Sequence, residues 1–155
     1  MKVLIGEYRD DDLDREIDVT IDNYDIWSLD HTLAYIIHPA LILLKSKKHG
    51  SPNIDDEDVP EPLRSTSAPP KKNTWDTDDN WFLRWAYILD EMIWAFGQLC
   101  DGDDEDKFYD HSECGDGDLM ESVSKLKVDR EGLRLHQERR ANGFRLFGKY
   151  YQGLW

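Results

Sequence analysis

The sequence predicts an α+β domain in which two or three long helices pack on a small two- to three-stranded antiparallel sheet. Two long apolar patterns at helical spacing and one alternating run typical of a strand support this prediction. With 155 residues, the chain has the length of a single domain, residues 1–155. Within it we expect a long proline-rich acidic loop over residues 50–73 and a second acidic loop over residues 100–118.

The sheet is expected near the N-terminus. Val3–Ile5 is a short apolar run, and Glu16–Ile21 alternates apolar with polar residues, which is the period of a half-buried strand. The two runs can pair as an antiparallel hairpin. A third strand is expected over Val123–Val128.

The stretch from Trp27 to Lys48 predicts the central helix. Ser28 is a suitable N-cap, and Asp30 places a carboxylate in the first turn, near the free N–H groups. No charged residue occurs from His31 to Leu44, so we expect this helix to be buried on nearly all sides. Pro39 should kink the helix or break it.

A second helix is expected after Thr77 or Asp78, either of which can cap it, and it should end near Gly97. One apolar stripe at helical spacing should pack on the central helix: Trp81, Phe82, Trp85, Ile88, Leu89, Met92, Ile93 and Phe96.

A long C-terminal helix is expected to begin at Asp129. Its candidate core positions are Leu133, Leu135, Phe144, Phe147 and Tyr151. Three glycines weaken this helix and either allow close packing or break it: Gly132, Gly143 and Gly148.

The charge is distributed unevenly along the chain. The net charge is −14, but residues 122–155 hold eight basic and three acidic residues, a net of +5, so the first 121 residues carry −19. An acidic body repels nucleic acid, so we expect no direct contact with it. The acidic body suits a basic partner, a cation, or the chain's own C-terminal segment folding back.

The cysteine content and the N-terminal sequence predict a compartment. The N-terminus, MKVLIGEYRDDD, has no apolar signal segment, and the uncharged run of the central helix is only 14 residues long and contains Pro39. We therefore expect no membrane span. A soluble protein of a reducing cytoplasm, with Cys100 and Cys114 as free thiols, is the resulting expectation.

Three acidic residues next to apolar helix positions are candidate metal ligands. Asp30, Asp90 and Glu91 could hold a divalent cation if the first two helices are antiparallel neighbours. Some all-helical nucleoside-triphosphate pyrophosphohydrolases use such acids, but their paired glutamates one turn apart are absent here. The alternative is that Asp30 caps a helix while Asp90 and Glu91 face solvent or pair with C-terminal arginines.

Two other patterns resemble metal sites less closely. Asp101–Asp106 has the alternating oxygens of a calcium loop, but lacks the glycine at the sixth position and the glutamate at the twelfth. Cys100, His111 and Cys114 could bind zinc, although no fourth ligand is evident. We expect no resident cofactor beyond a possible divalent cation, and a solvated loop at residues 101–106.

Four motifs of the chain are distinctive: YDIWSLDHTLA, KSKKHGSPNIDDEDVPEPLRSTSAPP, WDTDDNWFLRWAYILDEMIWAF and NGFRLFGKYYQGLW. They resemble a family of uncharacterised proteins from tailed, largely marine bacteriophages. The resemblance covers residues 19–155 and is weakest around Asp101–Glu121. It implies a setting, the cytoplasm of the infected bacterial host or the virion, but no mechanism.

The hypothesis that we favour is an acidic accessory protein that binds, and could inhibit, a host protein with a basic surface, by presenting carboxylates where that protein expects phosphates. Catalysis is the less expected activity. The candidate binding residues lie at the start of the long loop: His49, Asp55, Asp56, Glu57 and Asp58.

Two other hypotheses remain open. One is a small metal-dependent nucleotide hydrolase that uses Asp30, Asp90 and Glu91. The other is a virion or assembly component, whose interface would include exposed aromatic residues at the C-terminus: Tyr150, Tyr151 and Trp155.

Overall fold

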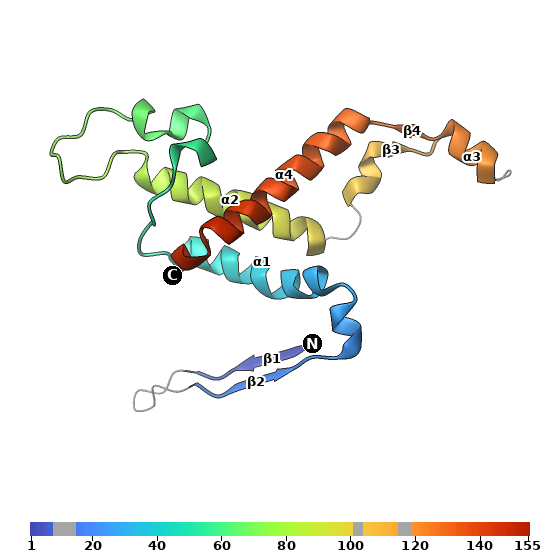
Figure 1. The fold of residues 1–155 in the computed structure, drawn as a ribbon, viewed down its shortest axis with the longest axis horizontal. Coiled ribbons are helices and arrows are strands. Elements are labelled where there is room, and N and C mark those ends of the chain that lie inside the picture. The colour runs from blue at the N-terminus through green and yellow to red at the C-terminus, as the bar shows by residue number, and fades with distance from the viewer. Residues whose placement is uncertain (8–14, 101–103, 115–118) are drawn as a thin grey trace.

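The structure, a computed structural model, describes residues 1–7, 15–100, 104–114 and 119–155. Its elements in chain order are β1 (Lys2–Ile5), β2 (Ile17–Thr20), α1 (Leu29–Lys47), α2 (Trp81–Cys100), β3 (Tyr109–Asp110), α3 (Leu119–Lys125), β4 (Lys127–Val128) and α4 (Arg130–Lys149). Long helices accompany two small antiparallel sheets, β1–β2 and β3–β4 (Figure 1). The predicted α+β class is therefore confirmed.

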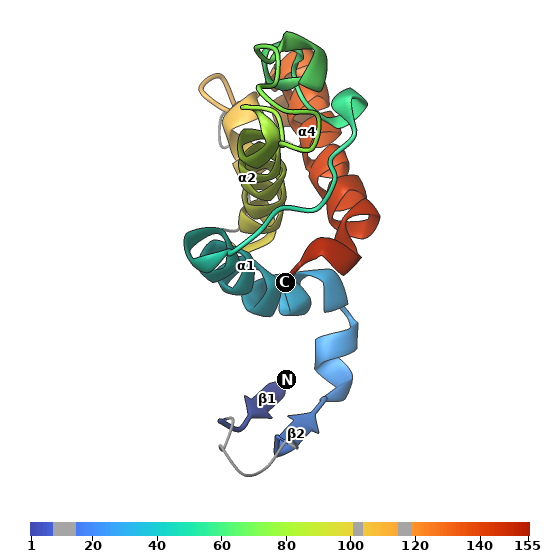
Figure 2. The same cartoon turned by 90° about the vertical axis from the view of Figure 1, so that its left-hand side faces the viewer.

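Helix α2 forms the centre of the molecule, because both α1 and α4 pack against it (Figures 1 and 2). Its apolar stripe supplies the fully buried side chains Trp85, Ile88, Leu89 and Met92. The expected packing of this stripe on the preceding long helix is confirmed, except that Phe82, a predicted member of the stripe, is exposed. The helix continues past Gly97 to Cys100, and it starts at Trp81, three residues after Asp78.

Helix α4 crosses α2 at Gly143. A Cβ atom at this position would lie 2.4 Å from the Ala95 Cβ and 2.7 Å from the Glu91 carbonyl oxygen. The glycine therefore lets the two helix backbones approach closely, which is one of the two expected roles. In contrast, a Cβ at Gly148 would have no neighbour within 4 Å.

The buried face of α4 differs in part from the expected one. Leu135 and Tyr151 are exposed, so their expected core positions are wrong, and His136 and Leu146 are buried in their place. The crossing at Gly143 fixes which side of the helix faces α2, and Leu146 lies three residues from Gly143 on that side.

Helix α1 is not buried on nearly all sides, so that expectation is wrong. Only Ala34 and Leu41 are buried in it, whereas Tyr35, Ile36, Ile42 and Leu43 are 41–64% exposed. The helix runs through Pro39 without a break. One side of α1 packs on α2, and within the described residues no element covers the opposite side.

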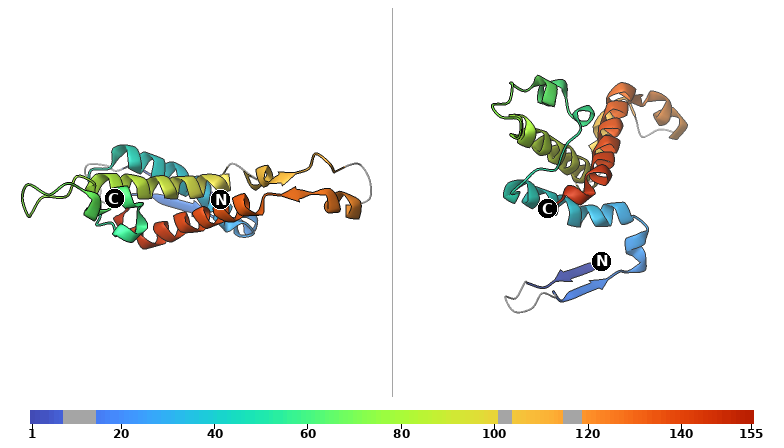
Figure 3. Two further views of the ribbon diagram at one scale, coloured as in Figure 1. Left: turned by 90° about the horizontal axis from the view of Figure 1, so that it is seen from above. Right: turned by 60° about the vertical axis from the view of Figure 1, so that its left-hand side comes forward.

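The β1–β2 hairpin agrees with the predicted one. Val3 pairs with Val19 and Ile5 with Ile17, so these four apolar side chains share one face. The hairpin is separated from the helices, and α1 is the nearest long helix to it (Figures 1 and 3). None of the hairpin residues belongs to the buried core.

The third predicted strand, Val123–Val128, is largely wrong. Its first three residues belong to α3, and β4 is limited to Lys127–Val128, which pairs with β3 in a separate sheet. A two-residue strand is too short for an alternating pattern to reveal it.

Three observations complete the fold. Residues 48–80, between α1 and α2, contain three short 3₁₀ turns, Asp56–Asp58, Glu61–Leu63 and Ser65–Ser67. Cys100 and Cys114 form no disulfide, as expected. Among the described residues, no helix combines the length and the apolar character needed to cross a bilayer.

Candidate functional site

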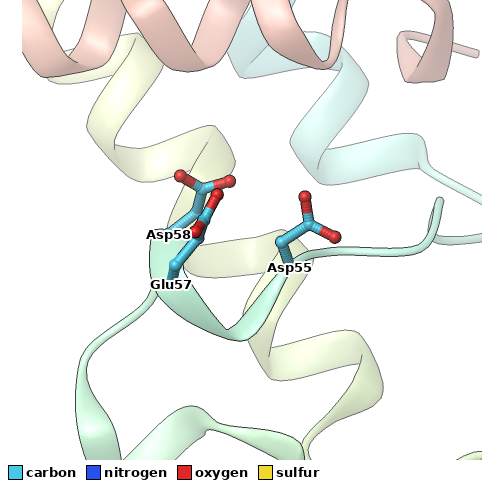
Figure 4. Close-up of side chains that lie close together, drawn as sticks. All are labelled: Asp55, Glu57 and Asp58. Carbon is cyan, nitrogen blue, oxygen red and sulfur yellow. The ribbon is translucent and has the colours of Figure 1, made fainter.

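The acidic turn, residues Asp55–Asp58, contains four of the five predicted binding residues. The neighbouring side chains Ile54 and Val59 are buried in the core, so the turn is held against the helices at both ends. The carboxylates of Asp55, Glu57 and Asp58 lie within 4.8 Å of one another, and Figure 4 shows that they point to the same side of the turn.

Helix α4 neutralises this cluster. The Lys149 Nζ lies 2.8 Å from Asp55 Oδ2, 2.6 Å from Asp58 Oδ2 and 3.2 Å from Glu57 Oε1. These hydrogen bonds, first to Asp55 and then to Asp58, raise the pKa of Lys149. The ammonium group thus takes the place that a cation would occupy among the three carboxylates, and the cluster serves to hold the turn on α4.

Asp58 is the most firmly held of the acidic residues. It is buried, and it accepts hydrogen bonds from Arg145 Nη2 and the Tyr150 hydroxyl, each at 2.6 Å. Burial alone would raise its pKa, but the hydrogen bonds from Lys149, Tyr150 and Arg145 outweigh burial, so the pKa of Asp58 is lowered.

Tyr150 is buried, so its expected place in an exposed interface is wrong. Its hydroxyl donates to Asp58 and accepts from the backbone N–H of Asp55 at 3.1 Å. Burial and the hydrogen bond to Asp58 raise the pKa of Tyr150 to about 12. The tyrosine is therefore part of the anchor between the acidic turn and α4.

A second ion pair fixes the segment that precedes α2. Arg84 donates from Nη1 and Nη2 to the two carboxylate oxygens of Asp78, both at 2.8 Å, and the two side chains are only 3% and 7% exposed. Arg84 Nη1 also reaches the Leu63 carbonyl oxygen at 3.3 Å. The hydrogen bonds from Arg84 lower the pKa of Asp78. The Asp78 carboxylate also accepts the N–H of Asn80, the residue before α2, so Asp78 fixes the turn that leads into the helix and the predicted cap at Thr77 or Asp78 lies two or three residues too early.

An open depression of about 570 Å³ lies between the acidic turn and the Asp78–Arg84 pair. Asp55, Asp56 and Glu57 line it, so three of the predicted binding residues meet there, together with Asp78 and two cations, Lys71 and Arg84. Since Arg84 is paired with Asp78, the depression has an excess of negative charge.

The acidic residues of the depression differ in how freely they can meet a ligand. Asp56 accepts from the backbone N–H of Ser65 at 2.7 Å and from its hydroxyl at 2.5 Å, and these bonds lower the pKa of Asp56. Glu57 is 78% exposed and can rotate towards solvent. His49 is exposed and does not line the depression, and Asp58 faces α4.

The structure does not bring Asp30, Asp90 and Glu91 together. Asp30 lies in the first turn of α1, whereas Asp90 pairs with Lys45 near the other end of that helix. Glu91 forms a two-point ion pair with Arg139 of α4, at 2.8 and 3.0 Å. The alternative prediction is that Asp90 and Glu91 face solvent or pair with C-terminal arginines, and the pairing is confirmed for Glu91.

Within the described part of the chain, Asp55, Glu57 and Asp58 are the only group of three or more potential ligand side chains close enough to share an ion. Cys100, His111 and Cys114 are all described and do not form such a group. Of the expected calcium-like loop, residues 101–103 lie outside the described residues.

Sequence reasoning missed the residues that hold the site: Lys149, Arg145 and Tyr150 on one side and Arg84 on the other. The basic excess of the C-terminal segment was the available signal, but it could not indicate which cation meets which acid. Comparisons of the chain with protein-family models, with curated proteins and with solved structures find no match.

Proposed function

We propose that the protein is an acidic accessory protein that binds a basic surface of a partner protein. The distribution of charge carries this proposal. Residues 1–30 contain ten acidic and three basic residues, and residues 101–121 contain ten acidic and one basic. The remaining residues, 31–100 and 122–155, contain thirteen acidic and fifteen basic residues, so the negative charge lies outside the helical bundle.

The bundle neutralises its own acids. Arg139 meets Glu91, and Arg145 and Lys149 meet the acidic turn, so the basic residues of α4 are largely committed to contacts within the fold. The two acidic segments together hold only four basic residues. A surplus of negative charge accelerates association with a positively charged surface and disfavours binding to nucleic acid.

The depression supports the proposal with a place where a basic side chain of the partner can enter. A lysine or arginine there would meet the exposed Glu57 and the outer side of Asp56. We infer from the resemblance to phage proteins that the partner is a host protein. Carboxylates in the position of phosphates would then compete with the natural ligand of a host nucleic-acid-binding protein.

The test is an affinity purification of the tagged protein from lysate of the infected host, washed at low and then at high salt. We expect one stoichiometric basic protein that salt releases, because exposed charges are screened. Recovery of no partner at low salt contradicts the proposal.

A matched pair of variants tests the depression. The double variant Asp56→Asn/Glu57→Gln should lower the yield of the partner. Glu131→Gln/Glu138→Gln removes the same charge from exposed positions on α4, where both acids pair with Arg134. It should leave the yield close to that of the wild type. Equal losses in the two variants would show that net charge, and not the depression, determines binding.

A virion or assembly component is the second candidate, and a specific observation favours it. Apolar side chains are exposed along β1–β2 and α1, and Tyr151 and Trp155 are exposed at the C-terminus. Such surfaces are typical of chains that assemble. Mass spectrometry of purified particles tests this candidate, and absence of the protein from them would exclude it.

A further inference from the structure

The β1–β2 hairpin has an apolar face that nothing in the described chain covers. This hairpin face consists of Val3, Ile5, Ile17 and Val19, and the last three are 50–66% exposed. The opposite face carries Lys2 and Asp18, which form an ion pair. An isolated two-stranded hairpin is at best marginally stable in water, so an amphipathic one needs a surface to cover it.

A second uncovered apolar surface lies on α1. This outer face consists of Ile36, Ile42 and Leu43, which are exposed and point away from the buried Ala34 and Leu41, whereas the Tyr35 hydroxyl donates to the Cys100 carbonyl oxygen of α2. From Ile36 to Leu43 it extends over roughly 10 Å, which is close to the length of a four-residue strand. Both faces therefore have matching lengths and the same apolar character.

The outer face continues into a groove of about 250 Å³ that is lined by apolar side chains alone. Ile36 and Ala40 of α1 form one side of this groove, and Phe147 and Leu154 form the other. A branched side chain such as Ile17 or Val19 has the size and polarity to enter it.

Charged residues follow the apolar ones in the same order on both surfaces. Glu7, which is exposed, follows Ile5 at the two-residue spacing that places it on the hairpin face, whereas Glu16 alternates to the opposite face with Asp18. Lys47, which is exposed, follows the outer face of α1, and Lys45 and Lys48 lie beside it. Burial and repulsion by Lys45 lower the pKa of Lys48, as expected where cations gather.

We propose that the protein forms a twofold dimer in which the hairpin face of each copy docks on the outer face of α1 of the other. Both surfaces belong to the same chain, so a single rotation satisfies both of them. The order of apolar and charged residues then brings Glu7 of one copy next to Lys47 of its partner. This dimer does not depend on the proposed binding of a basic protein.

The test is the molar mass of the purified full-length protein in solution, measured by light scattering and by sedimentation over a wide range of concentration. We expect a dimer that persists at high salt, because apolar burial does not weaken with salt. The salt response separates the dimer from the salt-sensitive complex proposed above. A monomer at every concentration overturns the proposal.

Matched substitutions locate the interface. Ile17→Thr and Val19→Thr each should weaken the dimer at least about tenfold, because each removes an apolar side chain from the interface twice. Leu4→Thr, on the opposite face of the hairpin and also exposed, should leave the dissociation constant within about twofold. Equal effects of Ile17→Thr and Leu4→Thr overturn the proposed face.

A charge exchange identifies the occupant of the outer face of α1. Glu7→Lys and Lys47→Glu each should weaken the dimer at low salt, and the double variant Glu7→Lys/Lys47→Glu should restore it. A dimer in which two hairpins pack on each other would show no such restoration, and that result overturns the docking of the hairpin on α1. Circular dichroism of each variant shows whether the helices remain folded.

Discussion

Replacement of Gly143 by alanine tests whether α4 is held on α2 by close contact of the two backbones. The added Cβ would lie 2.4 Å from the Ala95 Cβ and 2.7 Å from the Glu91 carbonyl oxygen. Neither atom is the end of a flexible side chain, so the two helices must move apart. Forced expansion of a packed contact costs typically about 1–3 kcal/mol, and two contacts below 3 Å place this substitution in the upper part of that range, at about 2–3 kcal/mol.

The expected net effect is smaller than the cost of the clash. Alanine is favoured over glycine inside a helix by about 1 kcal/mol, which offsets part of that cost. We therefore expect Gly143→Ala to lower the free energy of unfolding by about 1–2 kcal/mol and the melting temperature by a few degrees, at roughly 2–4 °C for each kcal/mol.

Gly148→Ala provides the matched control. It lies on the same helix, is exposed, and would bring the new Cβ within 4 Å of nothing. It should raise the free energy of unfolding by roughly 0.5–1 kcal/mol. Urea unfolding followed by circular dichroism measures both variants. If Gly143→Ala is as stable as the wild type or more stable, the close crossing is refuted.

Three further predictions concern the anchors of the acidic turn and of α2. Arg84→Lys loses the two-point hydrogen bond to Asp78 and should lower the free energy of unfolding, measured in urea, by about 2–3 kcal/mol. The reason is that one ammonium group cannot form the two parallel hydrogen bonds that the planar guanidinium makes with the carboxylate. Since the pKa of Asp58 is lowered in the folded protein, its ion pairs stabilise the fold above the unfolded value of about 3.9, and this contribution is lost as the pH falls through the folded-state pKa. Asp58→Asn should therefore be less stable at neutral pH, and its thermal unfolding should depend less on pH in the acidic range. Lys149→Met removes the ammonium from among three carboxylates, so its melting temperature should fall and Mg²⁺ should restore part of the loss, whereas Mg²⁺ should not affect the wild type more than an inert salt of equal ionic strength does.

The long helices could be predicted from the sequence because their apolar patterns extend over five turns or more. α2 has one continuous apolar stripe, and the structure places the stripe from Trp85 onwards in the core and leaves only its early member Phe82 exposed. α4 has a weaker pattern, interrupted by three glycines, so the sequence indicated the helix but not the side that faces inward. Only the approach at Gly143, a contact between distant segments, decides that Leu146 is buried and Leu135 is exposed.

The candidate site could be predicted only in part, for a related reason. Four consecutive acids mark the acidic turn, and the surplus of basic residues after residue 121 indicates that internal pairing is available. Pairing in the folded chain then distinguishes the acids. Lys149 and Arg145 hold the buried Asp58, whereas Asp56 and the exposed Glu57, which Lys149 also reaches at 3.2 Å, line the depression. A local sequence pattern does not indicate which of several basic side chains will pair with a given acidic residue in the folded chain.

Helix α1 shows how an apparent error of prediction can be informative. A helix that is apolar on nearly all sides is normally covered on all sides, yet the chain covers only the side around Ala34 and Leu41. Ile36, Ile42 and Leu43 remain exposed, so the free energy that their burial would provide is not gained within the single chain. The same holds for Ile17 on the hairpin. The chain thus exposes two apolar surfaces of similar length, one followed by negative and the other by positive charge. A subunit removed from the proposed dimer would expose such surfaces. In that dimer α1 would be covered on nearly all sides, as expected for an apolar helix.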